Sequence, residues 1–331
     1  MAKKKKKHPV RGLISFCIVL ALILAIGYSG LQILGSTDLQ NIDDLLQNTP
    51  SKTIERDGVK YFPRQDISVM LVMGIDQKGP VESSNYYRNS GSADSIMLLI
   101  FDEKNEECSV LYVNRDTMME MDVLGVRHEY AGTTYGQVAL AHTYGDGLES
   151  SCENVKNTLM KFFHGLTIDY YIAMNMDAVP IMNDAVGGVT VNVVDDFSAV
   201  NPSITMGELT LKGDQVLDYV RTRKDVGDQK NITRMERQTD YMDGFLRALQ
   251  EKETDDLGFI VNLYDEVAPY LVSDCPISTL TNMVEDYTEF AISEVYTLEG
   301  ENIIGEDHYE FYADEEKLDE LAVSLFYAPK R

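Results

Sequence analysis

The sequence has few of the residues, and none of the short motifs, that mark several common enzyme classes. It contains no tryptophan and only four cysteines among 331 residues, with no C-x-x-C pair, so a zinc ribbon or a thioredoxin-like motif is not expected. No G-x-x-x-x-G-K-S/T loop, G-x-S-x-G elbow or H-E-x-x-H segment is present, which argues against a P-loop nucleotide enzyme in particular. The five histidines lack metal-ligand spacing, and His142 is interpreted as structural. The sequence leaves the disulfide state of Cys108, Cys152 and Cys275 open.

Basic residues are also scarce. The chain has 29 Lys and Arg against 54 Asp and Glu, for a formal net charge of −25. Six of the basic residues lie within the first 11 positions, so the remainder has 23 basic and 54 acidic residues and a net charge of −31. Such a surface repels nucleic acid, and a local basic cluster within it is therefore informative.

The N-terminal segment combines a basic flank with an uncharged apolar run. Residues 3–7 are lysines, and with Arg11 they precede residues 12–34, which carry no charge and are rich in Leu and Ile. A run of about 20 apolar residues is long enough to span a bilayer, and the basic flank favours a cytoplasmic N-terminus. A cleaved signal peptide is the alternative. We expect a cytoplasmic tail (1–11), a single transmembrane helix (12–34), a polar and irregular juxtamembrane stem (35–66) and an extracellular domain (67–331).

The rest of the sequence alternates short apolar runs with helical patterns. Residues 68–74, 95–101 and 108–113 are nearly continuous apolar runs, which are typical of buried strands. The alternation predicts an α/β fold, a single α-β-α domain whose mixed central sheet is covered by helices on both faces. Further strands are expected at residues 168–175, 189–194 and 293–298, with a hairpin edge at 207–213. Helices are expected at residues 135–144, 149–163, 176–186, 214–220, 231–249, 255–286 and 314–326.

Residues 218–238 form a basic cluster in this acidic chain. Arginine presents a planar fork of donors that suits phosphate oxygens. Asn231 is a favourable N-cap for a following helix, and a helix N-terminus also favours anions. The cluster predicts an anion-binding site, and salt bridges on a solvated surface are the alternative. Its basic residues are Arg221, Arg223, Lys224, Lys230, Arg234 and Arg237.

Charged side chains also flank the first three apolar runs. Asp76 follows the first run, Asp94 precedes the second, and Arg115 with Asp116 follows the third. Ligands of α/β folds bind beyond strand ends, and two carboxylates with phosphate oxygens and water are a typical Mg²⁺ environment. Together with the arginine cluster, these residues predict phosphoryl or phosphate-ester transfer. A turn or cap role is the alternative for each aspartate.

Several ordered segments carry a family resemblance: MLVMGIDQ, SADSIMLLIFD, VNRDT, IDYYIAMNMDAVPIMNDAVGGVTVNV, LDYVRTRKD and TRMERQ. Over residues 67–249 they resemble the LytR-CpsA-Psr family of Gram-positive bacteria. The resemblance implies transfer of a glycopolymer, such as teichoic acid or capsule, from a polyprenyl (pyro)phosphate carrier to peptidoglycan, with a pyrophosphatase side activity left open. It also implies an apolar tunnel for the polyprenyl tail.

The resemblance assigns roles to particular residues of this sequence. It implies that Asp76 and Asp94 bind Mg²⁺. Catalytic roles are implied for Arg115, Arg221, Arg223, Asp225 and Arg234. Substrate binding is implied for Arg115, Arg221, Arg223, Arg234, Arg237 and Gln238.

Three positions depart from the family pattern. Ser92 stands where an arginine is usual, Asn231 where an aspartate is usual, and Asn114 replaces the proline of PRDT. These changes remove one phosphate contact and one candidate proton acceptor. A protein that binds polyprenyl-linked phosphates without turnover is therefore an alternative, and a scaffold or signalling domain without a ligand is a further one. The nearest substitutes for the missing side chains are Arg88, Asp225 and Asp228.

Overall fold

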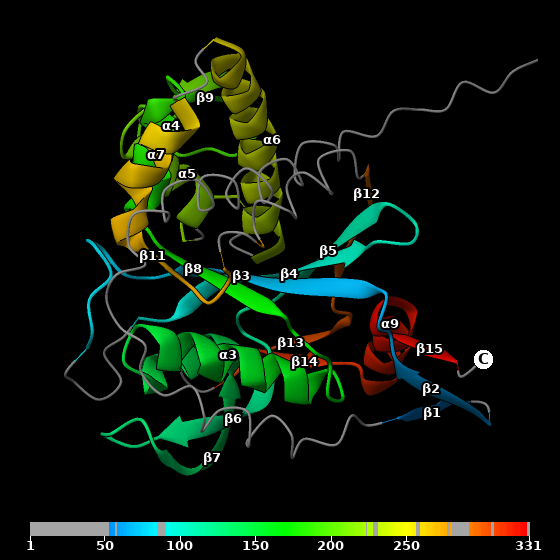
Figure 1. Ribbon diagram of the computed structural model, residues 1–331. Helices are drawn as coiled ribbons and strands as arrows, with labels where there is room; N and C mark the ends of the chain where they lie inside the picture. The colour runs from blue at the N-terminus through cyan, green and yellow to red at the C-terminus, as the bar shows by residue number, and fades with distance from the viewer. Residues whose placement is uncertain are drawn as a thin grey trace, which may run out of the picture. The chain divides into compact units, whose positions relative to one another are not determined.

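The computed structural model describes most of the chain after residue 52 as two compact units (Figure 1). The described residues are 53–56, 58–84, 91–222, 224–227, 231–255, 259–276, 279, 291–305 and 308–329. The sheet unit lies within residues 29–175, 271–275 and 295–331, and the helical unit lies within residues 176–270 and 276–294. The sequence predicted a single domain over residues 67–331, which stays a prediction.

The predicted N-terminal tail, the transmembrane helix and the first part of the stem lie outside the described residues. Within the described residues, no helix is both long and apolar enough to cross a membrane.

A six-stranded sheet forms the centre of the sheet unit. Strand β3 pairs antiparallel with β4 and parallel with β8, so the sheet is mixed, as the sequence predicted. The strands β3 and β4 are buried along most of their length, because both of their faces are apolar. Across the sheet, the order is β11 (Leu271–Ser273), β8 (Tyr170–Asn175), β3 (Ile67–Ile75), β4 (Ala93–Asp102), β5 (Glu107–Val113) and β12 (Ala291–Thr297).

One face of this sheet packs into the main hydrophobic core. Alternate residues of β3, such as Leu71 and Met73, point into this core because side chains alternate along a strand. Helix α3 (Glu149–Phe162) contributes Val155 and Leu159 to the same core, and Figure 1 shows α3 lying along the sheet. The opposite face of the sheet carries a second apolar set, Met70, Val72, Met97 and Leu99.

The stem prediction is wrong for its second half. Strands β1 (Ile54–Arg56) and β2 (Val59–Pro63) pair with each other, and β2 pairs with β15 (Tyr327–Pro329) near the other end of the chain. Ile54 belongs to the core. The polar sequence suggested an irregular stem because β2 also depends on β15, a partner more than 260 residues away, and local composition does not encode such pairing.

Two predicted helices are also partly wrong. Tyr135 to Gln137 belong to strand β7 (Tyr130–Gln137), which pairs with β6 (Met118–Leu124), and only residues 138–144 are helical, as the 3-10 helix η3 (Val138–Tyr144). Within residues 255–286, helix α7 (Phe259–Val267) leads into a short 3-10 turn, η4 (Ala268–Tyr270), and then into β11. Pro269 lies in that turn, and proline disfavours a continuing helix.

The helical unit follows the predicted order. Strands β9 (Val189–Val193) and β10 (Gly207–Leu211) pair antiparallel and lie at the strand predicted over 189–194 and the hairpin edge predicted over 207–213. Helix α6 (Asn231–Asp255) contacts β9 and buries Tyr241, Phe245 and Leu249, which lie on one face of the helix at four-residue intervals. The other helices of the unit are α4 (Ala178–Ala185), α5 (Gln215–Arg221) and α7.

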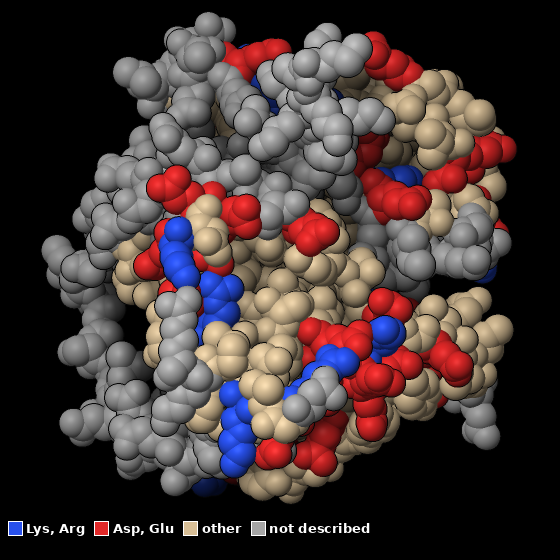
Figure 2. Space-filling model, turned by 90° about the vertical axis from the view of Figure 1, so that its right-hand side faces the viewer, with Lys and Arg blue, Asp and Glu red and all other residues tan. Residues whose placement is uncertain are grey.

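The C-terminal part of the sheet unit adds a hairpin and a helix. Strands β13 (Gly300–Ile304) and β14 (Tyr309–Ala313) pair antiparallel. Helix α9 (Glu315–Phe326) follows, and its N-cap Asp314 accepts a hydrogen bond from the backbone N–H of Lys317 at 3.0 Å. On the face shown in Figure 2, Asp and Glu side chains are spread widely, in line with the acidic composition.

The ion pairs of Arg64, which lies between β2 and β3, predict a pH dependence of stability. Its guanidinium bonds Asp66 at 2.9 Å and Asp102 at 2.7 Å. Burial raises the pKa of Asp102, but hydrogen bonds from Arg64 and Asn105 outweigh it, so this pKa lies below its ordinary 3.8. The hydrogen bond from Arg64 likewise lowers the pKa of Asp66.

A carboxyl group whose pKa is lower in the folded than in the unfolded protein stabilises the fold at pH values above its unfolded-state pKa. This stabilisation is lost as the pH falls through the folded-state pKa. Arg64→Met is therefore expected to move the acid-unfolding midpoint to higher pH, as followed by circular dichroism. Lys60→Met removes an exposed cation from neighbouring β2 and should leave the midpoint unchanged. Equal midpoints for Arg64→Met and wild type would refute the proposed linkage.

Candidate active site

A bulge at one end of the sheet sets the position of Asp94. Gly74 pairs with Ser95 and Ile75 pairs with Ala93, so Asp94 is the extra residue on β4. The backbone N–H of Asp76 donates to the carbonyl of Ser92 at 2.8 Å, which places Asp76 and Asp94 at the same end of neighbouring strands. Bulges re-aim side chains and are common beside functional sites.

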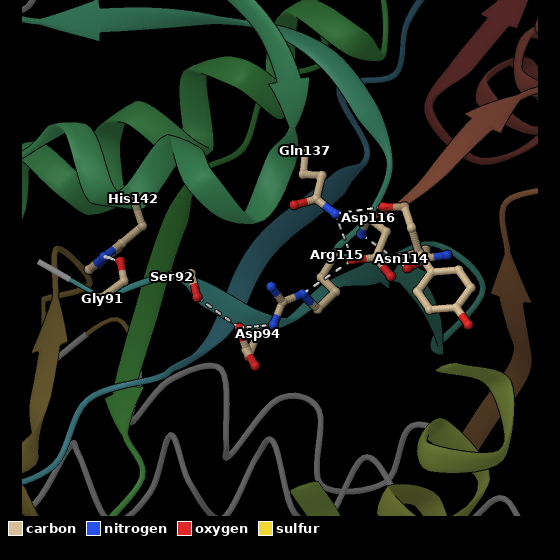
Figure 3. Close-up of polar contacts among 9 residues, drawn as sticks. Gly91, Ser92, Asp94, Asn114, Arg115, Asp116, Gln137 and His142 are labelled. Atoms are coloured by element: carbon tan, nitrogen blue, oxygen red, sulfur yellow. Dashed lines mark hydrogen bonds and ion pairs between the residues drawn. The ribbon is translucent and has the colours of Figure 1, made fainter. Parts of the chain in front are cut away.

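Arg115 lies in the loop after β5 and forms an ion pair with Asp94. Its Nη1 contacts Asp94 Oδ1 in a short ion pair, and its Nε lies 3.4 Å from Asp116 Oδ1 (Figure 3). The Ser92 hydroxyl donates to the same Asp94 oxygen at 2.9 Å. The side chains of Arg115 and Asp94 are 17% and 22% exposed, so the pair is held by the protein and still reaches solvent.

Asn114 holds the Arg115 loop in a turn. Its side-chain Oδ1 accepts a hydrogen bond from the backbone N–H of Asp116 at 3.1 Å, and its carbonyl accepts from the Thr117 hydroxyl at 2.6 Å. An asparagine side chain that bonds the backbone two residues later restrains a turn. The residue that stands in place of the family's proline therefore has its own means of ordering this loop.

Gln137 and His142 support the same region, and sequence reasoning assigned neither to the site. Gln137 Nε2 donates to Asp116 Oδ1 at 3.0 Å and to the carbonyl of Tyr309 at 2.7 Å. The buried His142 Nδ1 lies 2.9 Å from the carbonyl of Gly91, a contact that requires a proton on Nδ1 (Figure 3). Gly91 has φ +79°, and a Cβ there would lie 2.6 Å from Gln77. The sequence signal that could have identified them is a polar residue at a position expected to be buried, because such a residue needs a hydrogen-bond partner.

The helical unit carries the other predicted site residues. Arg221 ends α5 and is exposed, and Asp225 is exposed with φ +61°. Arg234 is buried on α6, and Gln238 donates to the carbonyl of Val220 at 3.1 Å. Arg223, Arg88, Asp228 and the side chain of Asn231 lie outside the described residues.

Arg237 is built into the helical unit as a structural centre. Its Nε donates to the carbonyl of Tyr219 at 2.9 Å, its Nη1 bonds Asp195 at 2.6 Å, and its Nη2 donates to the carbonyl of Thr222. Its guanidinium also lies 5.4 Å from the centre of the Phe197 ring. These contacts order the backbone around Arg221, while phosphate binding by Arg237 itself stays a prediction.

The loop after Arg221 packs against Asp195, the aspartate that also bonds Arg237. Gly227 has φ +55°, and a Cβ at this position would lie 2.7 Å from Asp195 Oδ1, so only glycine fits here. Val226 in this loop is buried. Nearby, burial raises the pKa of the Tyr219 and Tyr241 hydroxyls, so neither phenol acts as a base near neutral pH.

Asp76 and Asp94 are the two carboxylates at this sheet end that are predicted to hold a Mg²⁺ ion. Among the described residues, no group of three or more His, Cys, Asp or Glu side chains could hold a metal by itself. Mg²⁺, however, usually takes one or two carboxylates and fills its remaining positions with phosphate oxygens and water. Arg115 and Ser92 both contact Asp94, so a metal would share this carboxylate with them.

Together, these features describe a mixed α/β protein with an arginine–aspartate pair at a sheet end and a buried arginine network in a helical unit. The chain belongs to the LytR_cpsA_psr family, whose model matches residues 34–326.

Named relatives and solved structures are consistent with this membership. The chain is 26% identical over 200 residues to the polyisoprenyl-teichoic acid–peptidoglycan teichoic acid transferase TagU of Bacillus licheniformis, covering 59% of this chain and 56% of that protein. It is 25% identical over 195 residues to TagU of Bacillus subtilis, with the same coverages. The matched segment thus spans about half the length of these relatives.

Solved structures share the fold at lower sequence identity. A structure described as TagT bound to LI-WTA has a TM-score of 0.58 at 20% identity, covering 84% of this chain and 96% of that one. Bacillus subtilis TagV has a TM-score of 0.57 at 20% identity, covering 79% and 96%. The protein gbs0355 of Streptococcus agalactiae has a TM-score of 0.62 at 21% identity, covering 78% and 86%.

Proposed function

We propose that this protein transfers an anionic glycopolymer from a polyprenyl (pyro)phosphate carrier to peptidoglycan, by phosphotransfer outside the membrane. The observation that carries the proposal is the Arg115–Asp94 pair on its bulge, beside Asp76. In a chain of net charge −25, this partly exposed guanidinium is a local site for an anionic phosphate. The names of the TagU relatives support transfer of teichoic acid to peptidoglycan.

The proposed reaction is a displacement at phosphorus. An acceptor hydroxyl attacks the phosphorus atom that is linked to the donor sugar, and the bond between that phosphorus and the carrier oxygen breaks. The polyprenyl phosphate leaves with the bonding electrons, and the hydroxyl proton passes to a base. Asp225 is our candidate base, and its exposed position suits a proton that must reach solvent.

The residues of the sheet unit supply electrostatic stabilisation. Asp94 orients Arg115, and Asp116 and Gln137 restrain the same loop. A donor fixed in advance at the position of developing charge stabilises a transition state without reorganisation. Mg²⁺ held by Asp76 and Asp94 would neutralise phosphate charge when bound. Arg221, Arg223 and Arg234 are proposed to bind the remaining phosphate oxygens.

A protein that binds polyprenyl-linked phosphate without turnover is a second candidate. The observations that favour it are the occupied donors of Arg237 and Ser92 at the usual arginine position.

We also propose the cytoplasmic tail, the single membrane span and the extracellular position of the main domain from the N-terminal sequence.

The metal prediction tests the proposal directly. Full-length protein in detergent is given a lipid-linked glycopolymer and peptidoglycan, and the transfer rate is measured against Mg²⁺ concentration. We expect saturable Mg²⁺ dependence, and we expect Asp76→Asn to raise the Mg²⁺ concentration for half-maximal rate by roughly 10-fold or more, as loss of one carboxylate predicts. Asp177→Asn, which removes a carboxylate from the helical unit, is the control.

The outcomes separate the candidates. Lipid that co-purifies with the protein, without transfer or phosphate release in Mg²⁺, would favour the binder. Transfer at full rate in excess chelator would contradict the metal prediction, and equal Mg²⁺ curves for wild type and Asp76→Asn would contradict the role of Asp76.

A further inference from the structure

Two hairpins of the sheet unit present tyrosines to solvent. Tyr135 on β7 is 60% exposed, Tyr312 on β14 is 36% exposed, and Ile303 on β13 is 45% exposed. A parallel bridge between Thr117 and Phe311 joins the two hairpins, and β14 contacts β6 of the other hairpin. These three side chains are called the tyrosine patch.

The register of the β13–β14 hairpin explains why the patch faces outward. Phe311 is 5% exposed and belongs to the core, so its neighbours Glu310 and Tyr312 point to the opposite side. Across the hairpin, Ile303 pairs with Glu310 and Glu301 pairs with Tyr312. The Tyr312 hydroxyl donates to Glu310 Oε2 at 2.7 Å, which orients the ring.

Carboxylates surround the patch. Glu120 pairs with Tyr135 across β6 and β7 and is exposed, and Glu301 and Glu310 lie on the β13–β14 hairpin. This charge disfavours a phosphate-rich polymer or an anionic lipid surface. Aromatic rings interspersed with hydrogen-bonding carboxylates suit an uncharged sugar chain, because sugar C–H faces pack on rings and sugar hydroxyls donate to carboxylates.

The two strands that carry the tyrosines, β7 and β14, are hydrogen-bonded to the Arg115 loop through neighbouring residues. Gln137, two residues after Tyr135, donates to Asp116. The backbone N–H of Phe311, next to Tyr312, donates to the carbonyl of Asp116 at 2.9 Å. Two residues of strand span about 7 Å, so a polymer on the patch could extend to the Arg115 loop.

We propose that the tyrosine patch binds the uncharged glycan backbone of the acceptor polymer and holds it beside Arg115. This inference rests on the proposed function for the identity of the acceptor. A second copy of this chain is a poorer match, because three partly exposed apolar side chains supply much less than the ~800 Å² per partner of a stable interface. The acidic rim would also face its own charge in a symmetric dimer.

The binding experiment uses full-length protein in detergent and a soluble β-linked N-acetylglucosamine oligomer, with isothermal titration calorimetry as the readout. The double variant Tyr135→Ala/Tyr312→Ala is expected to bind the oligomer about 10-fold more weakly, from loss of two aromatic contacts. Ile304→Ala is the matched control, since Ile304 is 77% exposed on the same hairpin but alternates to the other face.

Unchanged binding by the double variant would overturn the proposal, as would absence of binding by wild type or an equal loss in Ile304→Ala. Loss of self-association in the double variant, with oligomer binding retained, would assign the patch to a second copy.

A transfer assay separates this inference from the proposed function. With the oligomer as acceptor, the double variant should show a KM raised about 10-fold with kcat unchanged, because uniform binding is lost. If wild type binds the oligomer but transfers nothing to it, the proposed function is refuted and the role of the tyrosine patch still stands. If wild type transfers to the oligomer and the double variant has the same KM, the role of the tyrosine patch is refuted and the proposed function still stands.

Discussion

Arg115→Ala is expected to lower the rate of glycopolymer transfer by about 10²–10³-fold, the usual effect of removing one fixed donor from a developing negative charge. The guanidinium is held by Asp94 on one side and lies near Asp116 on the other. It therefore needs little reorganisation when the phosphate binds. The measurement is the initial rate of transfer by full-length protein at saturating Mg²⁺.

The fold should survive this substitution. Asp94 keeps the hydrogen bond that it accepts from Ser92, and the buried Asp116 keeps the one that its carboxylate accepts from Gln137 and the one that its backbone N–H donates to Asn114. The free energy of unfolding should therefore fall by only about 1–3 kcal/mol. Arg115→Lys keeps the charge but loses the planar fork, so its rate should lie between those of wild type and alanine.

Arg247→Ala is the matched control for Arg115. Arg247 is exposed on α6, and its loss should leave the rate within twofold or so of wild type, as expected for an isolated surface charge. A wild-type rate for Arg115→Ala would remove the central support of the proposed function. An equal loss in both variants would indicate a general charge effect rather than a site.

Arg237→Ala is expected to destabilise the protein by about 3–5 kcal/mol, because it leaves the carboxylate of Asp195 without its buried partner. The side chains of Arg237 and Asp195 are only 3% and 13% exposed. Two carbonyl groups, those of Tyr219 and Thr222, also lose their donor. The corresponding fall in melting temperature is roughly 10 °C, measured by circular dichroism or calorimetry.

A double-mutant cycle tests whether the Asp195 contact carries this effect. Asp195→Asn/Arg237→Ala should be less destabilised than the sum of the two single variants, since the second change removes the unpaired charge. Arg237→Ala with a wild-type melting temperature and reduced transfer would show instead that this arginine acts on the substrate, as the family resemblance implies.

The contrast between Arg115 and Arg237 shows how far the sequence can predict a site. Both belong to family motifs, and the resemblance implied phosphate binding by both. Only their contacts distinguish them. Arg115 is partly exposed beside carboxylates at a strand end, whereas Arg237 donates hydrogen bonds to three partners within the helical unit. Residue type predicts the capacity to bind phosphate, but the contacts that Arg237 already makes within the protein occupy its donors.

The support of the Arg115 loop was beyond sequence prediction for a related reason. Gln137 was placed in an expected helix, but the pairing of β7 with β6 makes it the last residue of a strand. From there it reaches Asp116, 21 residues away, and Tyr309, 172 residues away. The local pattern around Gln137 does not encode either partner.

The sequence alone determined the central apolar strands, the order of most helices, the acidic character of the chain and the family to which it belongs. These properties depend on local periodicity, composition and ordered motifs, which are written along the chain. The tertiary structure alone decided that Asp94 lies on a bulge against Arg115, that strands β1 and β2 join the C-terminal strand, and that Arg237 is enclosed. Each of these depends on contacts between distant residues, whose energies arise only when the chain has folded.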